Sequence, residues 1–291
     1  MAKYKHTIVK NGKGGYVVFP PFVTQKEMDL IEEKFVVRDD DVFVTAYPKS
    51  GTTWMEQIVH LTLNNGVQGD KVLSEAVPWV EGINRYQGVE KLLNQQAKPR
   101  RFHSHLPYHL MPGAKLNLAK YIYVARNPKD NAISFYFHSC SKLGYDGTWD
   151  EFFDLYIQGK VGYGSFFDHV LDWWQASQKS NNILFVKYED MKQDLRQAVK
   201  TVADFLGVKL DEELWEAIAS QSSFESMAAN PQANLDWVYQ RPEFPKHMRK
   251  GIIGDWRNYF TTEQNQIFDE IYLKSMKDTD LQFDFGEGII I

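Results

Sequence analysis

The stretch that decides the fold is DVFVTAYPKSGTTWMEQIVHLTL, residues 41–63. Residues 41–47 alternate in character and are rich in β-formers, so they predict a strand, and residues 55–63 predict a helix. The segment between them, residues 48–54, combines one glycine, one lysine and two threonines. Such a loop between a strand and a helix is typical of phosphate binding, because backbone N–H groups and the positive end of the helix dipole face the anion. On these residues alone, an ordinary strand–turn–helix with a solvated lysine remains open.

Two more strands are predicted at residues 120–125 and 182–188, each followed by a segment that predicts a helix, the second of them a single helix at 189–207. Residues 24–27 and 148–151 fit the Ser/Thr-x-x-Glu capping box that begins a helix. Strands that alternate with helices predict an α/β fold, with a central mostly parallel sheet flanked by helices and a P-loop-like strand–loop–helix. Ligands of such sheets bind at the carboxyl ends of the strands.

Composition limits the number of domains, the partners and the cellular location that can be expected. The 291 residues are 43% hydrophobic and 14% aromatic, which suffices for a sizeable core, and no repeat or linker divides them, so a single domain over residues 1–291 is expected. The net charge of −5 argues against a nucleic-acid partner. We find neither the apolar core of a signal peptide nor a run of about 18 apolar residues. With Cys140 as the one cysteine, which we interpret as an inert thiol, a cytoplasmic protein without membrane partners is expected.

The phosphate-binding segment is not a Walker A loop, because threonine rather than lysine follows Gly51. Instead YPKSGTTW, residues 47–54, resembles the 5′-phosphosulfate loop of the cytosolic sulfotransferase family. RKGIIGDWRNYF, residues 249–260, resembles the 3′-phosphate loop of the same family, and ARNPKDNAISFYF, residues 125–137, resembles its second 3′-phosphate element. The three motifs occur in the order and spacing of the family, and the similarity extends from about residue 19 to about residue 276.

The resemblance implies an enzyme that transfers a sulfuryl group from 3′-phosphoadenosine 5′-phosphosulfate to a hydroxyl or amine of a small molecule, releases adenosine 3′,5′-bisphosphate and needs no metal. The donor-binding residues that it implies are Lys49, Ser50, Gly51, Thr52, Thr53, Trp54, Arg126, Ser134, Tyr188, Ser222, Phe224, Met248, Arg249, Lys250 and Gly251. Arg126, Ser134 and Arg249 would grip the 3′-phosphate. Trp54 and Phe224 would stack on the adenine, with Tyr188 at its edge. Taken singly, each aromatic residue would instead be typical of core packing.

Catalysis is assigned by the same resemblance. His105, in the sequence HLP, matches the catalytic histidine of the family, and an imidazole can take a proton from a hydroxyl near neutral pH. Lys49 would stabilise charge on the departing phosphate, and Ser134 would hold this lysine away until the acceptor is bound. The family usually has a lysine where this chain has His103. Because only a protonated imidazole carries a full charge, we expect an unusual dependence of activity on acidity.

The acceptor pocket is expected to include Phe22, Trp79, His105 and His138. His138 stands where the family often has phenylalanine, so it faces either a more polar acceptor or solvent, and the sequence does not decide between them. Residues 143–147 and 232–244 are predicted to be flexible lids. The family's dimerisation motif is degraded here, with Arg257, Thr261, Thr262 and Gln266 at its positions, which leaves a monomer or a homodimer open.

Three alternatives were weighed against this interpretation. A nucleotide kinase would need a Walker loop, and an inactive nucleotide-binding scaffold would be expected to lack Lys49 or His105. Sulfotransferases that modify protein tyrosines or polysaccharides are usually anchored in the Golgi, and no anchor is recognisable here.

Overall fold

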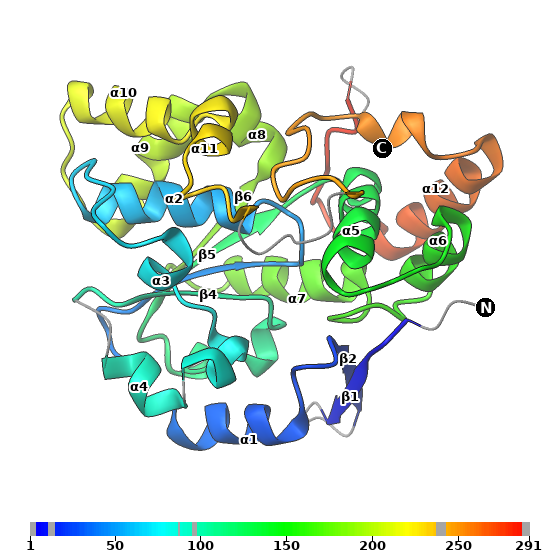
Figure 1. The fold of residues 1–291 in the computed structure, drawn as a ribbon, viewed down its shortest axis with the longest axis horizontal. Helices are drawn as coiled ribbons and strands as arrows, with labels where there is room; N and C mark the ends of the chain where they lie inside the picture. Colours follow the sequence, from blue (N-terminus) through cyan, green and yellow to red (C-terminus); the bar gives the residue numbers. More distant parts are fainter. Residues whose placement is uncertain (1–3, 11–14, 87, 95–97, 237–242, 287–291) are drawn as a thin grey trace.

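The predicted strand at residues 41–47 is β3 (Val42–Ala46), an inner strand of the central sheet in the computed structural model. The structure describes residues 4–10, 15–86, 88–94, 98–236 and 243–286. In that part of the chain the sheet has the order β4–β3–β5–β6, with β4 at Arg101–Ser104, β5 at Lys120–Ala125 and β6 at Ile183–Lys187. Each pairing is parallel, which confirms the predicted α/β class (Figure 1).

The helices of the described residues are α1 (Gln25–Lys34), α2 (Thr52–Leu63), α3 (Leu73–Ala76), α4 (Val89–Asn94), α5 (Pro128–Lys142), α6 (Trp149–Ile157), α7 (Phe166–Ser177), α8 (Tyr188–Gln193), α9 (Leu195–Leu206), α10 (Glu212–Gln221), α11 (Phe224–Ala229) and α12 (Thr262–Met276). Short 3₁₀ segments are η1 (Val80–Tyr86), η2 (Tyr108–Leu110), η3 (Ala114–Leu116) and η5 (Asp255–Asn258). The predicted capping boxes begin α1 at Thr24 and α6 at Thr148.

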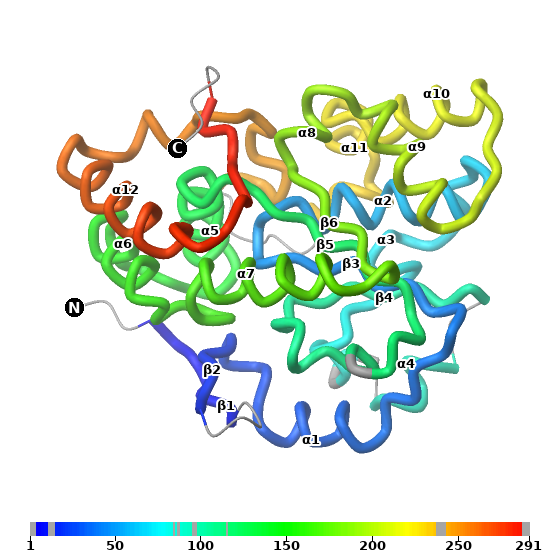
Figure 2. The backbone as a smooth tube through the Cα atoms, turned by 180° about the vertical axis from the view of Figure 1, so that it is seen from behind, coloured from blue at the N-terminus to red at the C-terminus, as the bar shows by residue number. Residues whose placement is uncertain are grey.

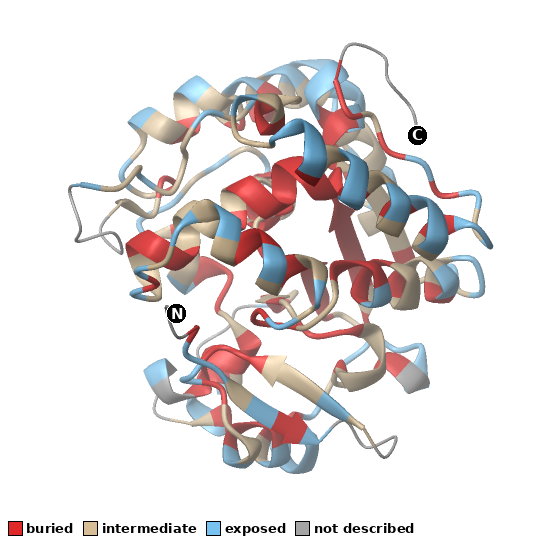
Figure 3. Cartoon of the chain, turned by 90° about the vertical axis from the view of Figure 1, so that its right-hand side faces the viewer, coloured by how far each residue is buried: buried red, intermediate tan, exposed pale blue. Residues whose placement is uncertain are grey.

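The side chains of β3 divide the core into two layers. Because successive residues of a strand point to opposite faces, Val42, Val44 and Ala46 pack in one cluster with apolar residues of α2, α9 and α10. Phe43 points the other way and stacks on Tyr121 of β5, with ring centroids 5.2 Å apart, in the cluster that includes α7. Figure 2 shows from behind that α7 and α2 lie on opposite sides of the sheet, and Figure 3 shows buried residues concentrated where helices meet it.

The structure corrects the sequence-based prediction in three places. It contains β4 and an antiparallel pair, β1 (Thr7–Lys10) and β2 (Tyr16–Phe19), none of which was predicted. The helix expected at residues 189–207 is divided at Asp194, whose extended backbone ends α8 and whose carboxylate caps α9. Helix α2 begins at Thr52, three residues before the predicted start, so its first turn belongs to the phosphate-binding segment. Whether residues 1–291 form one domain stays a prediction.

Candidate active site

The carboxyl ends of the four parallel strands deliver the predicted site residues to one pocket. Residues 48–51 follow β3, His105 follows β4, Arg126 follows β5 and Tyr188 follows β6. The predicted residues that line this pocket are Phe22, Lys49, Gly51, Thr52, Thr53, Trp54, Trp79, His103, His105, Arg126, Ser134, His138, Tyr188, Phe224, Met248, Arg249, Lys250 and Gly251. The predicted residues Ser50 and Ser222 are buried behind the lining.

The loop after β3 has a backbone shape that suits close approach of an anion. Lys49 and Gly51 both have left-handed backbones, with φ of 69° and 114°. A left-handed conformation is unfavourable for lysine, and such strain occurs most often at functional sites. At Gly51, an added Cβ would lie 2.9 Å from Cδ2 of Tyr188, so a side chain here would push against the end of β6. The loop leads into α2, whose first-turn N–H groups have no acceptor within the helix and point toward the pocket.

Helix α5 holds this loop in place through a residue that the sequence analysis did not single out. Asn131 donates from Nδ2 to the Pro48 carbonyl at 2.8 Å and lies 3.0 Å from Oγ of Ser50. Its own amide oxygen accepts from the hydroxyl of Tyr156 at 2.9 Å. Ser50 therefore has a supporting role in the loop through Asn131.

The predicted 3′-phosphate residues form a second basic group. Arg249 and Lys250 both pair with the buried carboxylate of Asp255, at 2.6 and 2.7 Å. Asp130, at the start of α5, fixes the following turn because its carboxylate accepts from the N–H of Gly254 at 2.7 Å. The guanidinium of Arg126 donates to backbone carbonyls, and its Nε is buried and has no hydrogen-bond partner. The Nε of Arg249 is in the same situation.

Aromatic residues lie at the end of the pocket where the adenine is expected. The indole N–H of Trp54 donates to the Ser222 carbonyl at 2.7 Å, and the Trp54 ring meets Tyr188 edge to face at 5.2 Å. Gly251 has a φ of 63°, and a Cβ at this position would lie 2.3 Å from Cδ2 of Phe224. Only glycine therefore lets the 3′-phosphate segment lie against the phenyl ring.

His105 is held in one orientation by the main chain. Its Nδ1 lies 2.9 Å from the carbonyl oxygen of Ala46, and since a carbonyl can only accept, Nδ1 carries the proton and Nε2 is left as the acceptor. The His105 backbone N–H donates to the buried carboxyl of Glu81 at 2.7 Å. Burial lowers the pKa of His105 to about 4. The hydrogen bond to Ala46 opposes this shift, and the charges of Lys49 and Lys142 add to it.

His103 faces Glu56, a residue that the sequence analysis did not include. The ring Nδ1 lies 2.9 Å from the Val77 carbonyl and 3.6 Å from Glu56 Oε1. Burial lowers the pKa of His103 to about 3, and burial raises the pKa of Glu56 to about 8. Between these values both side chains are uncharged, so the pair is not an ion pair near neutral pH. The dependence of activity on acidity that we expected from His103 stays a prediction.

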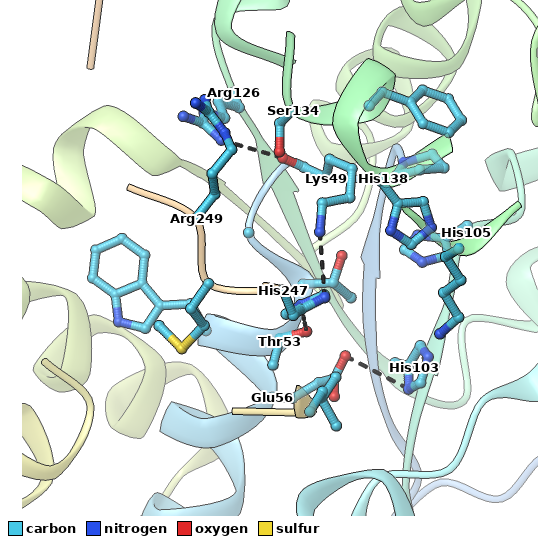
Figure 4. Close-up of a pocket in the computed structure, with 18 of the residues that line it drawn as sticks. Lys49, Thr53, Glu56, His103, His105, Arg126, Ser134, His138, His247 and Arg249 are labelled. Carbon is cyan, nitrogen blue, oxygen red and sulfur yellow. Dashed lines mark hydrogen bonds and ion pairs between the residues drawn. The ribbon is translucent and has the colours of Figure 1, made fainter. Parts of the chain in front are cut away.

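A further histidine, His247, connects the two basic groups. Its Nδ1 lies 3.4 Å from Nζ of Lys49, and its Nε2 lies 3.0 Å from Oγ1 of Thr53 (Figure 4). Burial, with smaller contributions from Lys142, Arg126 and Arg249, lowers the pKa of Lys49 to about 7. The signal for His247 in the sequence was its place two residues before Arg249.

The end of the pocket where the acceptor is expected contains aromatic side chains. Phe22 meets Trp79 edge to face at 5.4 Å, and Trp79 stacks on His103 at 6.0 Å with nearly parallel rings. His138 lines the pocket rather than facing solvent, and Figure 4 shows it beside Lys49 and His105. That His138 faces the acceptor stays a prediction.

The predicted lids are only partly described. In residues 143–147, Leu143 lines the pocket, whereas Tyr145 is buried against Phe152 with ring centroids 5.6 Å apart. Of residues 232–244, positions 237–242 lie outside the described residues. Motion of either segment stays a prediction.

Other predictions concern the rest of the chain. Cys140 is buried. At the positions of the dimerisation motif, Thr261 caps α12 and Arg257 donates to the carbonyls of Phe285 and Gly286, so both side chains bond within their own chain. The oligomeric state stays a prediction. No helix in the described ranges combines the length and apolar character required to cross a membrane. The same ranges contain no group of three His, Cys, Asp or Glu side chains placed to hold a metal ion.

The parallel sheet, the left-handed loop before α2 and the two basic groups define an α/β protein that binds phosphorylated ligands. Comparison with known proteins gives the family. The model of the sulfotransferase domain matches residues 39–280. The chain therefore belongs to the sulfotransferase family and is a sulfotransferase enzyme, and this decides against the nucleotide kinase.

Individual relatives agree over nearly the whole chain. Sulfotransferase 1C2 of Rattus norvegicus is 41% identical over 262 residues, which is 86% of this chain and 88% of the relative. Among solved structures, retinol dehydratase in a complex with retinol and PAP superposes with a TM-score of 0.80 at 28% identity, covering 94% of this chain and 90% of that chain. Mouse sulfotransferase SULT7A1 complexed with PAP gives a TM-score of 0.72 at 29% identity, with coverage of 92% and 94%.

Proposed function

We propose that this enzyme transfers a sulfuryl group from 3′-phosphoadenosine 5′-phosphosulfate to a hydroxyl or amine of a small molecule and releases adenosine 3′,5′-bisphosphate. Two structural neighbours above 25% identity were solved with PAP, the bisphosphate product of such a reaction. One of them also holds retinol, a small apolar alcohol, which supports a small-molecule acceptor for this chain.

The observation that carries the proposal is a set of buried hydrogen-bonding atoms without partners. They are Oγ1 of Thr52, Nε of Arg126, Oγ of Ser222 and Nε of Arg249. Buried polar groups in proteins nearly always have a partner, so the three such atoms on the lining residues Thr52, Arg126 and Arg249, with that of Ser222 just behind the lining, suit a polar ligand. Each of the four belongs to a residue expected to bind the donor. The residues present therefore fit the donor nucleotide.

The donor would lie across the pocket from the nucleotide end to the histidines. Trp54, Phe224 and Tyr188 would contact the adenine, and the hydroxyl of Ser222 would bond its edge. Arg126, Ser134, Arg249, Lys250 and Gly251 would hold the 3′-phosphate, with Met248 beside them. The first turn of α2 and residues 49–53 would hold the phosphosulfate. Figure 4 shows Lys49 between the two arginines and the histidine group, as this placement requires.

The reaction then needs a base on the acceptor side. Nε2 of His105 is the free acceptor of the ring, so it would take the proton of the acceptor hydroxyl as the oxygen–sulfur bond forms. The bond between sulfur and the bridging phosphate oxygen breaks in the same displacement, and the electron pair stays on that oxygen. The negative donor beside Lys49 would offset the cations that lower the His105 pKa, so the base would strengthen when the donor binds.

Lys49 would stabilise the charge that develops on the bridging oxygen. His247, within reach of both Lys49 and Thr53, would orient the ammonium toward this oxygen. Ser134 would restrain Lys49 before the acceptor binds. His103, whose Nδ1 donates to the Val77 carbonyl, would offer Nε2 as a neutral hydrogen-bond acceptor near the transferring group. In this scheme lysine, histidine and backbone N–H groups suffice, and no metal takes part.

The test compares nucleotides and then transfer. Calorimetry should show that adenosine 3′,5′-bisphosphate binds at least about tenfold more tightly than adenosine 5′-phosphate or ATP with magnesium, since only the bisphosphate engages both basic groups. With radiolabelled donor and a panel of phenols, alcohols and amines, the wild type should form sulfated product. His105→Ala and Lys49→Met should lose at least about 100-fold in kcat. Equal binding of the three nucleotides would overturn the donor assignment, and unchanged kcat in both variants would overturn the mechanism.

A further inference from the structure

The acceptor end of the pocket carries two cations that the donor does not use. Arg85, in η1, and Lys142, in the last turn of α5, line the same pocket as Trp79 and His105. The guanidinium carbon of Arg85 lies 5.4 Å from the centroid of the Trp79 ring, and this ring lies 6.1 Å from that of His105. Arg85 is thus separated from the proposed base by one indole ring.

Lys142 reaches the pocket from the other side. It follows His138 by four residues on α5, so the two side chains share one face of the helix. Its ammonium lowers the pKa of His103, His105 and Lys49, which places its positive charge within the reach of the whole catalytic group. The elements packed around the acceptor end therefore present positive charge from η1 and from α5.

The acidic side chains near this end of the pocket are buried; Glu81, whose carboxyl accepts from the backbone N–H of His105, has its pKa raised to about 7 by burial. Among the described residues that line the pocket, Glu56 is the acidic one, and burial raises its pKa to about 8. Burial and the charge of Arg85 lower the pKa of Lys142 to about 8, so the two cations repel each other. An anion between them would relieve this repulsion and stabilise both charged forms.

We propose that the acceptor is a hydroxylated aromatic acid, whose carboxylate is bound by Lys142 and Arg85 while its hydroxyl faces His105. This inference rests on the proposed function and names the substrate class of that site. The ring of such a molecule would lie against Phe22 and Trp79, which form the aromatic wall. A carboxylate is favoured over a neutral polar group because both recognising side chains are cations, and hydrogen bonds between charged groups are the stronger kind.

The test measures acceptor binding apart from transfer. Three phenolic acids of increasing length, 4-hydroxybenzoate, 4-hydroxyphenylacetate and 3-(4-hydroxyphenyl)propanoate, are each compared with the matching primary amide. Binding to the full chain saturated with adenosine 3′,5′-bisphosphate is followed by calorimetry, and kcat/KM is measured with the sulfated donor. We expect at least one acid to bind about tenfold or more tightly than its amide, the effect of a charge-assisted bond. Lys142→Gln and Arg85→Gln should remove most of that preference and change amide binding less than about twofold.

Two variants distinguish a loss of carboxylate recognition from damage to the fold. Lys26→Gln makes the same substitution at an exposed lysine outside the pocket, and should retain the preference for the acid. Lys142→Glu should bind 2-(4-hydroxyphenyl)ethylamine more tightly than the wild type does, a gain that misfolding cannot produce. The proposal is overturned if no acid binds more tightly than its amide, or if the preference survives in both neutral variants. Sulfuryl transfer to neutral phenols would still stand in that case, whereas failure of the bisphosphate to bind would overturn the proposed function itself.

Discussion

Raising the pH from 7 to 9 should weaken the binding of adenosine 3′,5′-bisphosphate, because Lys49 must be protonated to face the anion. In the free protein, burial and three neighbouring cations lower the pKa of Lys49 from 10.5 to about 7. A phosphate beside the ammonium favours the charged form and returns its pKa toward the ordinary value. Below pH 7 the lysine is already charged, so affinity is unaffected by Lys49; above pH 7 binding requires proton uptake, and affinity falls as the pH rises.

The magnitude follows from these two values. If the complex restores a pKa near 10.5, the dissociation constant rises about fivefold from pH 7 to pH 8 and about 50-fold from pH 7 to pH 9, and about 0.9 proton is taken up per ligand at pH 8. The ligand works in the opposite direction, because phosphate groups lose their second proton near pH 6 and only gain charge above it. Two other groups that line the pocket also titrate in this range, because burial brings the pKa of Lys142 down to about 8 and that of Glu56 up to about 8; both lose positive or gain negative charge as the pH rises and so act in the same direction as Lys49.

Isothermal titration calorimetry from pH 6.5 to 9, in buffers of different ionisation enthalpy, measures both the affinity and the protons taken up. Lys49→Arg replaces the ammonium by a guanidinium that stays charged, so its binding should depend on pH much less than that of the wild type over this range. Lys142→Gln removes the other titrating lysine and one of the charges that lower the Lys49 pKa, so the affinity should still fall with pH, but the fall should begin at a higher pH than in the wild type. A flat dissociation constant in the wild type, or the wild-type slope in Lys49→Arg, would refute the reasoning.

Two further predictions concern the binding of the bisphosphate and the stability of the fold. Gly251→Ala should weaken bisphosphate binding about tenfold in calorimetry, because the added Cβ would displace the Phe224 ring. Gly69→Ala is the control, since Gly69 has a similar φ of 71° but no atom within 4 Å of an added Cβ, and it should leave binding unchanged. Equal losses in both variants would refute the steric argument. Asp41→Ala should lower the melting temperature by roughly 5–15 °C. The buried guanidinium of Arg100 donates two hydrogen bonds to the Asp41 carboxylate, both at 2.6 Å, and the substitution would leave this charge without them. Exposed Asp39→Ala should leave that temperature unchanged, and a loss of 2 °C or less in Asp41→Ala would contradict the prediction.

Strands β3 and β5, which have apolar runs, were predictable, and the polar strand β4 was not. Residues 42–46 and 120–125 are buried on both faces, so their sequences are nearly continuous in β-formers and the prediction succeeded. Strand β4 has the sequence RFHS, in which three of four residues are polar, and it pairs at the edge of the sheet. Its place depends on hydrogen bonds to β3 rather than on a local pattern, so no periodicity could reveal it.

The site likewise contains residues that the sequence could predict and residues that it could not. Lys49, Arg126 and Arg249 lie in continuous motifs, and local sequence sufficed to predict that they share a pocket. Glu56 meets His103, and His247 meets Lys49, only because the sheet order and the return of the chain after α11 bring distant segments together. Separations of 47 and 198 residues leave no local signal for these contacts.

In the proposed mechanism, the strength of the base would depend on the presence of the donor. Burial, Lys49 and Lys142 lower the pKa of His105, and burial, Lys142, Arg126 and Arg249 lower the pKa of Lys49, so the free protein holds several cations close together. A donor with two anionic groups would compensate these charges and raise the pKa of both Lys49 and His105. His105 would therefore become an effective base only beside the sulfuryl group that the acceptor is to receive. An acceptor carboxylate at Lys142 would act on His105 in the same direction, which ties the selection of the acceptor to the same electrostatic balance.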